Sequence, residues 1–114
     1  MAARQTPNLC SRFQTAADLI GKRWTALVIQ RLQVGPQRYS ELAEALNQVS
    51  ERMLIERLKE LEGAGVVERR VIDDRPVRVE YRLTEKGRAL SGVVSGLARW
   101  AERWIPNTVG EPSN

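Results

Sequence analysis

Apolar side chains recur along most of this chain at the three- and four-residue spacing that is typical of amphipathic helices. Residues 13–20 form the first such segment, and Gly21 stops or bends the helix predicted there. Residues 24–32 predict a second helix. Gly35-Pro36 ends it, because the proline ring opposes helix continuation and restricts the residue before it. Two helices are therefore expected before the middle of the chain.

The middle of the chain predicts two further helices with a short polar break between them. Residues 38–46 form the shorter one and residues 50–61 the longer one. Their apolar faces are marked by Leu42 and Leu46 in the shorter helix and by Leu54, Leu58 and Leu61 in the longer one. We expect these faces to meet in the core. Ser50 suits the N-cap of the longer helix, because its hydroxyl can accept a hydrogen bond from the backbone N–H of Arg52 or Met53.

A period of two replaces the helical period after Gly65, which itself suits a left-handed residue at a helix end. In residues 77–83 the apolar Val77, Val79, Tyr81 and Leu83 alternate with Arg78, Glu80 and Arg82. This alternation is typical of a strand with one buried and one exposed face. Residues 66–72 are expected to pair with it, and Asp73-Asp74-Arg75-Pro76 supplies the turn. The segment therefore predicts a two-stranded wing with an arginine at its tip.

The last helix is predicted to begin at Thr84-Glu85, which cap and charge its first turn. Its apolar positions are Leu90, Val93 or Val94, Leu97, Trp100 or Ala101, and Trp104. Alternating steps of three and four are the period of a seam packed against another helix. Gly92 and Gly96 lower helix propensity by about 1 kcal/mol each relative to alanine, which a close-packed partner would offset. The seam predicts a homodimer.

A helix, a tight turn, a longer helix and a two-stranded wing together lay one helix in the major groove of DNA. We therefore expect a mainly α fold with a small β-hairpin (α+β), a winged helix-turn-helix with further helices at its N- and C-terminal ends. Residues 10–105 are expected to form this single domain. A flexible N-terminal arm at residues 1–9 and a flexible C-terminal tail at residues 106–114 are expected around it.

The composition excludes several other classes of protein. The 114 residues are 42% hydrophobic, which suits one small domain, and no apolar run is long enough to cross a bilayer. The N-terminus carries no apolar secretory stretch and a lone cysteine forms no intrachain disulfide, so a cytoplasmic protein is expected. The chain has no histidine, a single cysteine and no Gly-rich phosphate loop. No enzyme, metal site or cofactor is therefore predicted.

A series of short motifs occurs in a characteristic order and covers nearly all of residues 10–104. They are Cys10 at the mouth of the first helix, Asp18-Leu19-Ile20-Gly21, Arg23-Trp24-Thr25, Gly35-Pro36, Arg38-Tyr39-Ser40-Glu41-Leu42, Ser50, Met53-Leu54, Arg57-Leu58, Leu61-Glu62, Gly65-Val66-Val67-Glu68-Arg69, Val79-Glu80-Tyr81-Arg82-Leu83-Thr84 and Gly87. With them the chain resembles the HxlR-type winged helix-turn-helix regulators of bacteria and archaea. The resemblance implies a dimeric DNA-binding transcription factor whose first and last helices form the interface and whose fourth helix reads the major groove. The expected interface residues are Phe13, Leu90, Val94, Leu97, Trp100, Ala101 and Trp104.

The exposed face of the fourth helix is expected to read the bases. It carries Arg52, Glu56 and Lys59, flanked by Met53 and Ile55. Arg52 lies in the first turn and can pair bidentately with guanine. Glu56 can accept from cytosine or orient Arg52, while Ile55 or Met53 can contact a thymine methyl. The alternative is a solvated face held by ion pairs within the helix.

The net charge of +4 comes from 18 basic residues, all but three of them arginines, whose planar fork suits phosphates and guanine edges. Arg38 and Ser40 are expected to bind a phosphate at the start of the third helix. Arg75 and Arg78 are expected to reach the minor groove or its phosphates from the wing. The predicted DNA-binding residues are thus Arg38, Ser40, Ser50, Arg52, Met53, Ile55, Glu56, Lys59, Arg75 and Arg78.

Arg57 lies beside the core face of the same helix and leaves two interpretations open. It either forms an internal ion pair with an acidic residue such as Glu41 or Glu44 or contacts a phosphate.

Two features could receive a signal. Cys10 has Arg12 and a helix N-terminus near it, which favour a thiolate open to oxidants or electrophiles, unless it is a reduced cysteine with no regulatory role. Trp24, Trp100 and Trp104 either anchor the core and the interface or line a pocket for a small aromatic effector.

The sequence therefore predicts a sequence-specific regulator, expected to be a repressor, that binds double-stranded DNA as a homodimer on an inverted repeat. A redox or electrophile signal would enter through Cys10. The alternatives are a regulator whose signal is a small aromatic ligand in a Trp-lined pocket, and a winged-helix module that binds protein or RNA.

Overall fold

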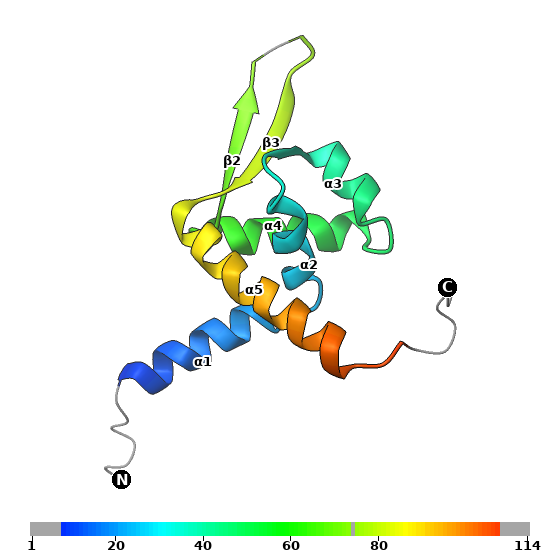
Figure 1. Ribbon diagram of the computed structural model, residues 1–114. Coiled ribbons are helices and arrows are strands. Elements are labelled where there is room, and N and C mark those ends of the chain that lie inside the picture. Colours follow the sequence, from blue (N-terminus) through cyan, green and yellow to red (C-terminus); the bar gives the residue numbers. More distant parts are fainter. Residues whose placement is uncertain (1–7, 74, 108–114) are drawn as a thin grey trace.

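The computed structural model describes the backbone of residues 8–73 and 75–107 and the side chains of residues 11–73 and 75–107. Within them the elements follow one another as α1 (Asn8–Ile20), α2 (Thr25–Leu32), β1 (Gln37–Arg38), α3 (Tyr39–Ala45), α4 (Glu51–Gly63), β2 (Val67–Ile72), β3 (Arg78–Leu83) and α5 (Glu85–Trp104) (Figure 1). The fold is mainly helical with a small antiparallel sheet, which confirms the predicted fold class.

The N-terminal boundary differs from the prediction. α1 begins at Asn8, so the first two residues of this helix belong to the domain rather than to an arm. Cys10 accordingly lies in the first turn of α1 and not ahead of it. Residues 1–7 of the expected arm and residues 108–114 of the expected tail lie outside the described residues.

The helices divide the molecule into two ends. α2, α3, α4 and the β2–β3 hairpin gather at one end, with the hairpin pointing away from the helices, and α1 and α5 lie at the other end (Figure 1). The side chains with at most 2% exposure lie between these ends and include Val28, Ile29, Leu32, Leu42, Leu54, Leu58, Leu61 and Val66. The apolar faces predicted for residues 38–46 and 50–61 therefore meet in one core, as expected.

The sheet has one strand more than the sequence predicted. Its order is β1-β3-β2 with both pairs antiparallel, and Gln37 of β1 stands opposite Tyr81 of β3. β1 is only two residues long, too short to produce a recognisable alternation. Val77 was expected to begin the buried face of the second strand, but it precedes β3 and is 58% exposed. The partner of Tyr81 on the other side is Arg69 of β2.

Side-chain hydroxyl groups cap the N-terminal ends of α4 and α5. The Ser50 hydroxyl accepts a hydrogen bond from the Met53 N–H at 3.1 Å, as predicted. The Thr84 hydroxyl accepts from the Gly87 N–H at 3.0 Å and donates to the Gly65 carbonyl at 2.6 Å. Thr84 thus joins the end of α4 to the start of α5. Gly65 has a φ of +78°, the left-handed conformation predicted for it.

Trp24 departs from the prediction that it begins the second helix. Its φ is +77°, a left-handed conformation that is uncommon for a residue with a side chain, and α2 begins one residue later. The indole is half-buried against the core, and the Arg23 guanidinium carbon lies 4.9 Å from its ring centroid. Packing therefore overrides the helical spacing at this position.

Gly87 lies in the first turn of α5, and a Cβ there would overlap the backbone carbonyl oxygen of Val66, just before β2. Backbone cannot move aside as a flexible side chain can. We predict that Gly87→Ala lowers the free energy of unfolding by about 2 kcal/mol or more, despite the better helix propensity of alanine. Thermal unfolding at one fixed protein concentration measures the change.

Gly92→Ala is the matched control, because nothing lies within 4 Å of a Cβ at that position of the same helix. Alanine should raise stability there by up to about 1 kcal/mol. Equal effects of the two substitutions would contradict the close approach at Gly87.

Candidate nucleic-acid interface

α4 presents one face to the core and the opposite face to solvent. Leu54, Leu58 and Leu61 are buried, so the rotation of the helix about its axis is set by these three side chains. The side chains turned outward are Arg52, Glu56 and Lys59, all exposed, with Ile55 at 42% exposure beside them. The structure thus brings together the residues that the sequence assigned to base reading, on one side of one helix.

Arg52 takes no part in the internal contacts of the described residues. It lies in the first turn of α4, is exposed, and has no hydrogen bond or ion pair with any described residue. Met53 is half-buried against the core, so its thioether is less available for a base contact than expected. The hydroxyl of Ser50 accepts the capping hydrogen bond of α4, so its role within the protomer is structural.

The start of α3 places Arg38 and Ser40 at the surface, as predicted for phosphate contacts. The backbone N–H of Arg38 donates to a Glu41 carboxylate oxygen at 2.7 Å, which holds the chain at the point where β1 becomes α3. Arg38 also stands opposite Glu80 in the sheet. The side-chain position is therefore fixed by both a helix start and a strand pair.

The wing carries more arginines than the sequence analysis assigned to DNA. Arg75 is exposed at the tip, and Arg78 is half-buried at the start of β3. Arg82 forms an ion pair with Glu68 at 3.0 Å across the hairpin. Arg69 and Arg70 of β2 are both exposed and were not singled out from the sequence. Successive side chains of a strand lie on opposite faces of the sheet. This alternation could have indicated from the sequence that Arg69 and Arg70 lie on different faces.

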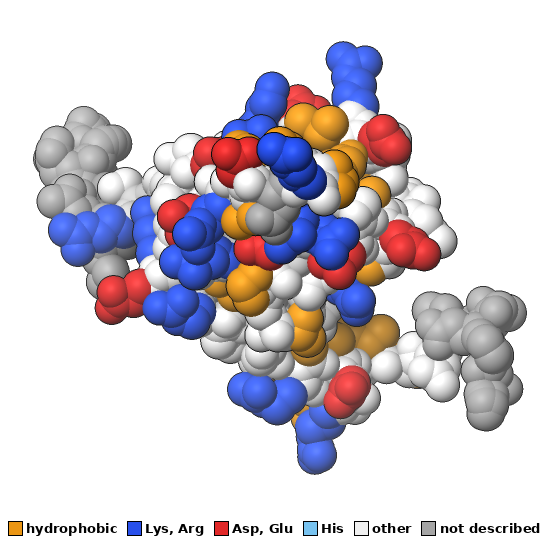
Figure 2. Space-filling view, turned by 90° about the horizontal axis from the view of Figure 1, so that it is seen from above, with side chains coloured by type: hydrophobic (Ala, Val, Ile, Leu, Met, Phe, Trp, Pro, Cys, Tyr) orange, Lys and Arg blue, Asp and Glu red, His pale blue; other side chains and the backbone are white. Residues whose placement is uncertain are grey.

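Basic side chains spread over the end of the molecule that carries the wing, with acidic side chains between them (Figure 2). α4 itself contributes Glu51, Glu56, Glu60 and Glu62 against Arg52, Arg57 and Lys59. The helix therefore carries no excess of positive charge, so an attraction for phosphate would depend on the arrangement of the basic groups and on the wing.

Arg57 forms the internal ion pair that the sequence left open, although its partner is Glu60 and not Glu41 or Glu44. Its guanidinium donates to a Glu60 carboxylate oxygen at 2.9 Å and to the backbone carbonyl of Arg23 at 2.9 Å. Lys22 binds the other Glu60 oxygen at 3.1 Å.

The Lys22 hydrogen bond and the two cations nearby lower the pKa of the Glu60 carboxyl, so the charged form is favoured. This cluster ties the turn between α1 and α2 to the side of α4 away from the wing.

The predicted interface residues divide between surface and core. Phe13, Leu97, Trp100 and Trp104 are each more than half exposed, and Leu90 and Ala101 are half-buried. Val94 is wrong as an interface residue, because it is only 2% exposed within the protomer and packs in its core. Val93, at 59% exposure, occupies the stripe in its place. Helical spacing alone could not decide between these neighbours.

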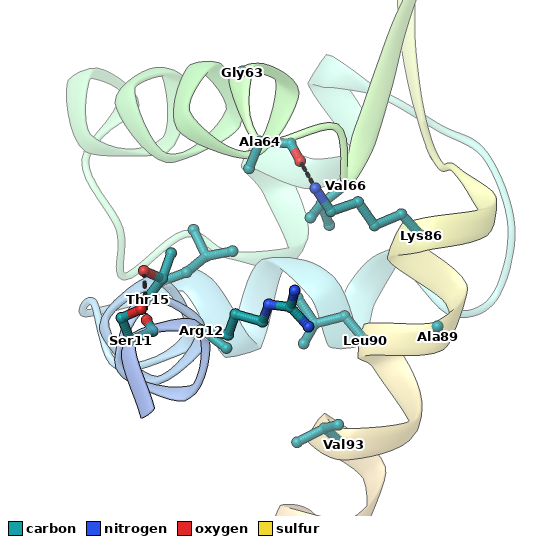
Figure 3. A pocket seen from close by; sticks show the side chains of 12 residues that line it. Ser11, Arg12, Thr15, Gly63, Ala64, Val66, Lys86, Ala89, Leu90 and Val93 are labelled. Atoms are coloured by element: carbon teal, nitrogen blue, oxygen red, sulfur yellow. Dashed lines mark hydrogen bonds between the residues drawn. The ribbon is translucent and has the colours of Figure 1, made fainter. Parts of the chain in front are cut away.

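A cavity of about 970 Å³ lies between α1, the end of α4 and α5 (Figure 3). Arg12, Leu90 and Val93 are among the residues that line it, and the Lys86 ammonium donates to the Ala64 carbonyl at its edge at 2.6 Å. No tryptophan lines this cavity. Trp24 packs on the core, whereas Trp100 and Trp104 are exposed on α5. The side chain of Cys10 lies outside the described residues.

A model of the HxlR-like helix-turn-helix family matches residues 19–109. The chain belongs to this family. Among curated proteins of Bacillus subtilis (strain 168), it is 50% identical over 97 residues to the uncharacterized HTH-type transcriptional regulator YvaP, covering 85% of this chain and 90% of YvaP. It is 45% identical over 96 residues to the HTH-type transcriptional regulator YodB, covering 84% of this chain and 86% of YodB.

Solved structures give the same result. The reduced form of YodB from B. subtilis superposes with a TM-score of 0.76 at 43% identity, over 86% of this chain and 96% of that one. The redox regulator HypR in its oxidized form gives 0.78 at 33% identity, over 86% and 99%. YodB has also been solved after diamide treatment and with a bound quinone.

The chain is therefore a transcriptional regulator with a DNA-binding helix-turn-helix, and the family is not one of enzymes. Among the described residues, no three histidine, cysteine, aspartate or glutamate side chains gather as a metal site would require. None of the helices in that part of the chain has the length and apolar character needed to span a membrane.

Proposed function

We propose that this protein is a sequence-specific repressor that binds double-stranded DNA in the cytoplasm as a homodimer on an inverted-repeat operator. The observation that carries the proposal is the exposed guanidinium of Arg52 in the first turn of the reading helix, which has no partner among the described residues. Such a fork can pair with the O6 and N7 of one guanine. A dimer seated over a promoter would exclude the polymerase sterically.

The exposed apolar stripe of α1 and α5 supports the dimer. Phe13 on α1 and Val93, Leu97, Trp100 and Trp104 on α5 are large side chains left at the surface of one protomer. Contiguous apolar surface of this kind marks an interface in a regulator. Twofold symmetry would then present two copies of α4 to half-sites centred about 34 Å apart, or a multiple of that distance.

Leu97→Glu tests the dimer. A carboxylate in the seam would be desolvated on association, so we predict monomers by light scattering and a loss of operator binding of at least about 100-fold. The protomer should still fold, because Leu97 is 52% exposed within it. Arg99→Glu, at an exposed position of the same helix outside the stripe, should stay dimeric. A monomeric native protein would contradict the proposal.

Arg52→Ala tests base reading against Arg75→Ala at the wing tip. We predict that the first costs roughly 1–3 kcal/mol and relaxes preference at one base pair, because a bidentate contact to guanine is lost. The second should weaken all duplexes alike and flatten the salt dependence by about one unit. Titrations of cognate and random duplexes measure both effects, and equal effects on the two duplexes would remove Arg52 from the reading role.

The same titrations separate the proposal from a winged-helix module that binds protein. Phosphate contacts give a steep loss of affinity with salt, whereas a protein-binding module would show no such dependence with duplex DNA. An RNA-binding module would bind single-stranded RNA more tightly than either duplex.

For the signal, we propose oxidation or electrophile addition at Cys10, the only cysteine of the chain. Its place in the first turn of α1 favours the thiolate, since the positive end of the helix dipole lies there. The relatives support this choice: YodB is known in reduced, diamide-treated and quinone-bound forms, and HypR is a redox regulator. A quinone would bond covalently to the sulfur, and an oxidant would join two copies by a disulfide.

Either change would add bulk or a crosslink beside the α1–α5 face and rotate one protomer against the other. We predict that diamide or a quinone abolishes operator binding by the native protein and leaves Cys10→Ser unaffected. Gel-shift titrations with mass spectrometry of the thiol measure this. Undiminished binding after confirmed reaction of the thiol would show that the signal enters elsewhere, with an aromatic ligand as the next candidate.

A further inference from the structure

A groove of about 510 Å³ separates the reading helix from the wing, and neither element alone forms it. Its lining residues are Tyr39, Ile55, Lys59, Glu62, Arg69, Val79 and Tyr81. Ile55, Lys59 and Glu62 follow one another at steps of four and three along the wing side of α4. The groove therefore adjoins the helix face that carries Arg52.

Strand register places one wing arginine in this groove and its neighbour outside it. Arg69 stands opposite Tyr81, and Arg70 stands opposite Glu80. Residues paired across a ladder share a face and successive residues alternate, so Arg69 lies on the inner face with buried Tyr81. Arg70 lies on the outer face. Neither Arg69 nor Lys59 has a hydrogen bond or ion pair with a described residue.

The phenol of Tyr39 adds an unsatisfied donor at the same place. Its hydroxyl oxygen is buried and has no hydrogen-bond partner among the described residues. Burial, and then the negative charge of Glu51, raise the pKa of Tyr39, so the group stays protonated and able to donate. A buried hydroxyl without a partner is unfavourable, and a partner that arrives with a ligand removes that penalty.

We propose that this groove seats a phosphate of the DNA backbone, held by Arg69 and Lys59 and accepting a hydrogen bond from the Tyr39 hydroxyl. The inference rests on the proposed DNA binding. It adds Arg69 and Tyr39 to the residues that position the duplex, and it assigns Lys59 to a phosphate between the reading helix and the wing. The two cations outweigh Glu62, the one acidic lining residue, which suits one phosphate. Ile55 and Val79 offer apolar surface to the adjoining deoxyribose. The exposed Lys59 and Arg69 side chains move onto the phosphate as it enters.

The first test compares Arg69→Gln with Arg70→Gln in the full chain. The two positions share a strand, a charge and exposure, and differ in the face of the sheet. Affinity for a random duplex is measured by fluorescence anisotropy over a range of salt concentrations. Arg69→Gln is expected to reduce the slope of log K against log salt by about 0.9, and Arg70→Gln to leave it close to that of the native protein.

Tyr39→Phe supplies an independent readout, because it removes the hydroxyl and keeps the ring. Duplex affinity is expected to fall about three- to tenfold with an unchanged salt slope, since the lost donor is neutral. The melting temperature of the free protein is expected to stay the same or rise, since a buried unsatisfied group has gone. A purely structural hydroxyl would instead lower the melting temperature and leave affinity unchanged.

The outcomes separate this inference from the function on which it rests. Steep salt dependence of the native protein, with equal slopes for Arg69→Gln and Arg70→Gln, overturns the phosphate seat and leaves DNA binding intact. If the Tyr39→Phe variant binds duplex DNA with the affinity of the native protein, the hydroxyl does not contact the phosphate. Absence of duplex binding by the native protein overturns the proposed function and the seat together.

Discussion

The burial of Leu54, Leu58 and Leu61 is the constraint on which the rest of the site depends. Each leucine contributes about 1.5–3 kcal/mol by leaving water, and together they leave α4 only one rotation about its axis. That rotation turns Arg52 outward and Ile55 toward the wing. Packing of the apolar core thus determines which polar side chains of α4 face solvent, although none of the three leucines would contact DNA.

Each flank of α4 is then held by a different kind of contact. On one side Arg57 and Lys22 converge on Glu60, which ties the helix to the turn before α2. On the other side the inner face of the wing borders a groove rather than a packed contact. One flank of α4 is therefore held by ion pairs, whereas the other flank borders a groove. The groove lies beside the exposed face that carries Arg52.

Polar contacts also join the DNA-reading end of the molecule to the end that carries the apolar stripe. Gln33, just after α2, donates to the Ser91 carbonyl at 2.9 Å and to the Ser95 hydroxyl at 2.9 Å on α5. Thr84 and Lys86 link the end of α4 to the start of α5. A movement of α5 against a second protomer would therefore be passed to α4, because these hydrogen bonds join the end of α4 to the start of α5.

The sequence by itself determined the local structure: Ser50 and Thr84 as caps, Gly65 as a left-handed residue, the leucine stripe of α4 and the outward position of Arg52. These follow from period and from residue chemistry within a few positions along the chain. Tertiary structure decided whether Val93 or Val94 faces solvent, where Arg57 finds its carboxylate, and that residues 37–38 join the sheet. It also placed Arg69 beside α4 and forced Trp24 into a left-handed conformation. Each of these depends on neighbours distant in sequence, and periodicity along one segment carries no information about the segment it will meet.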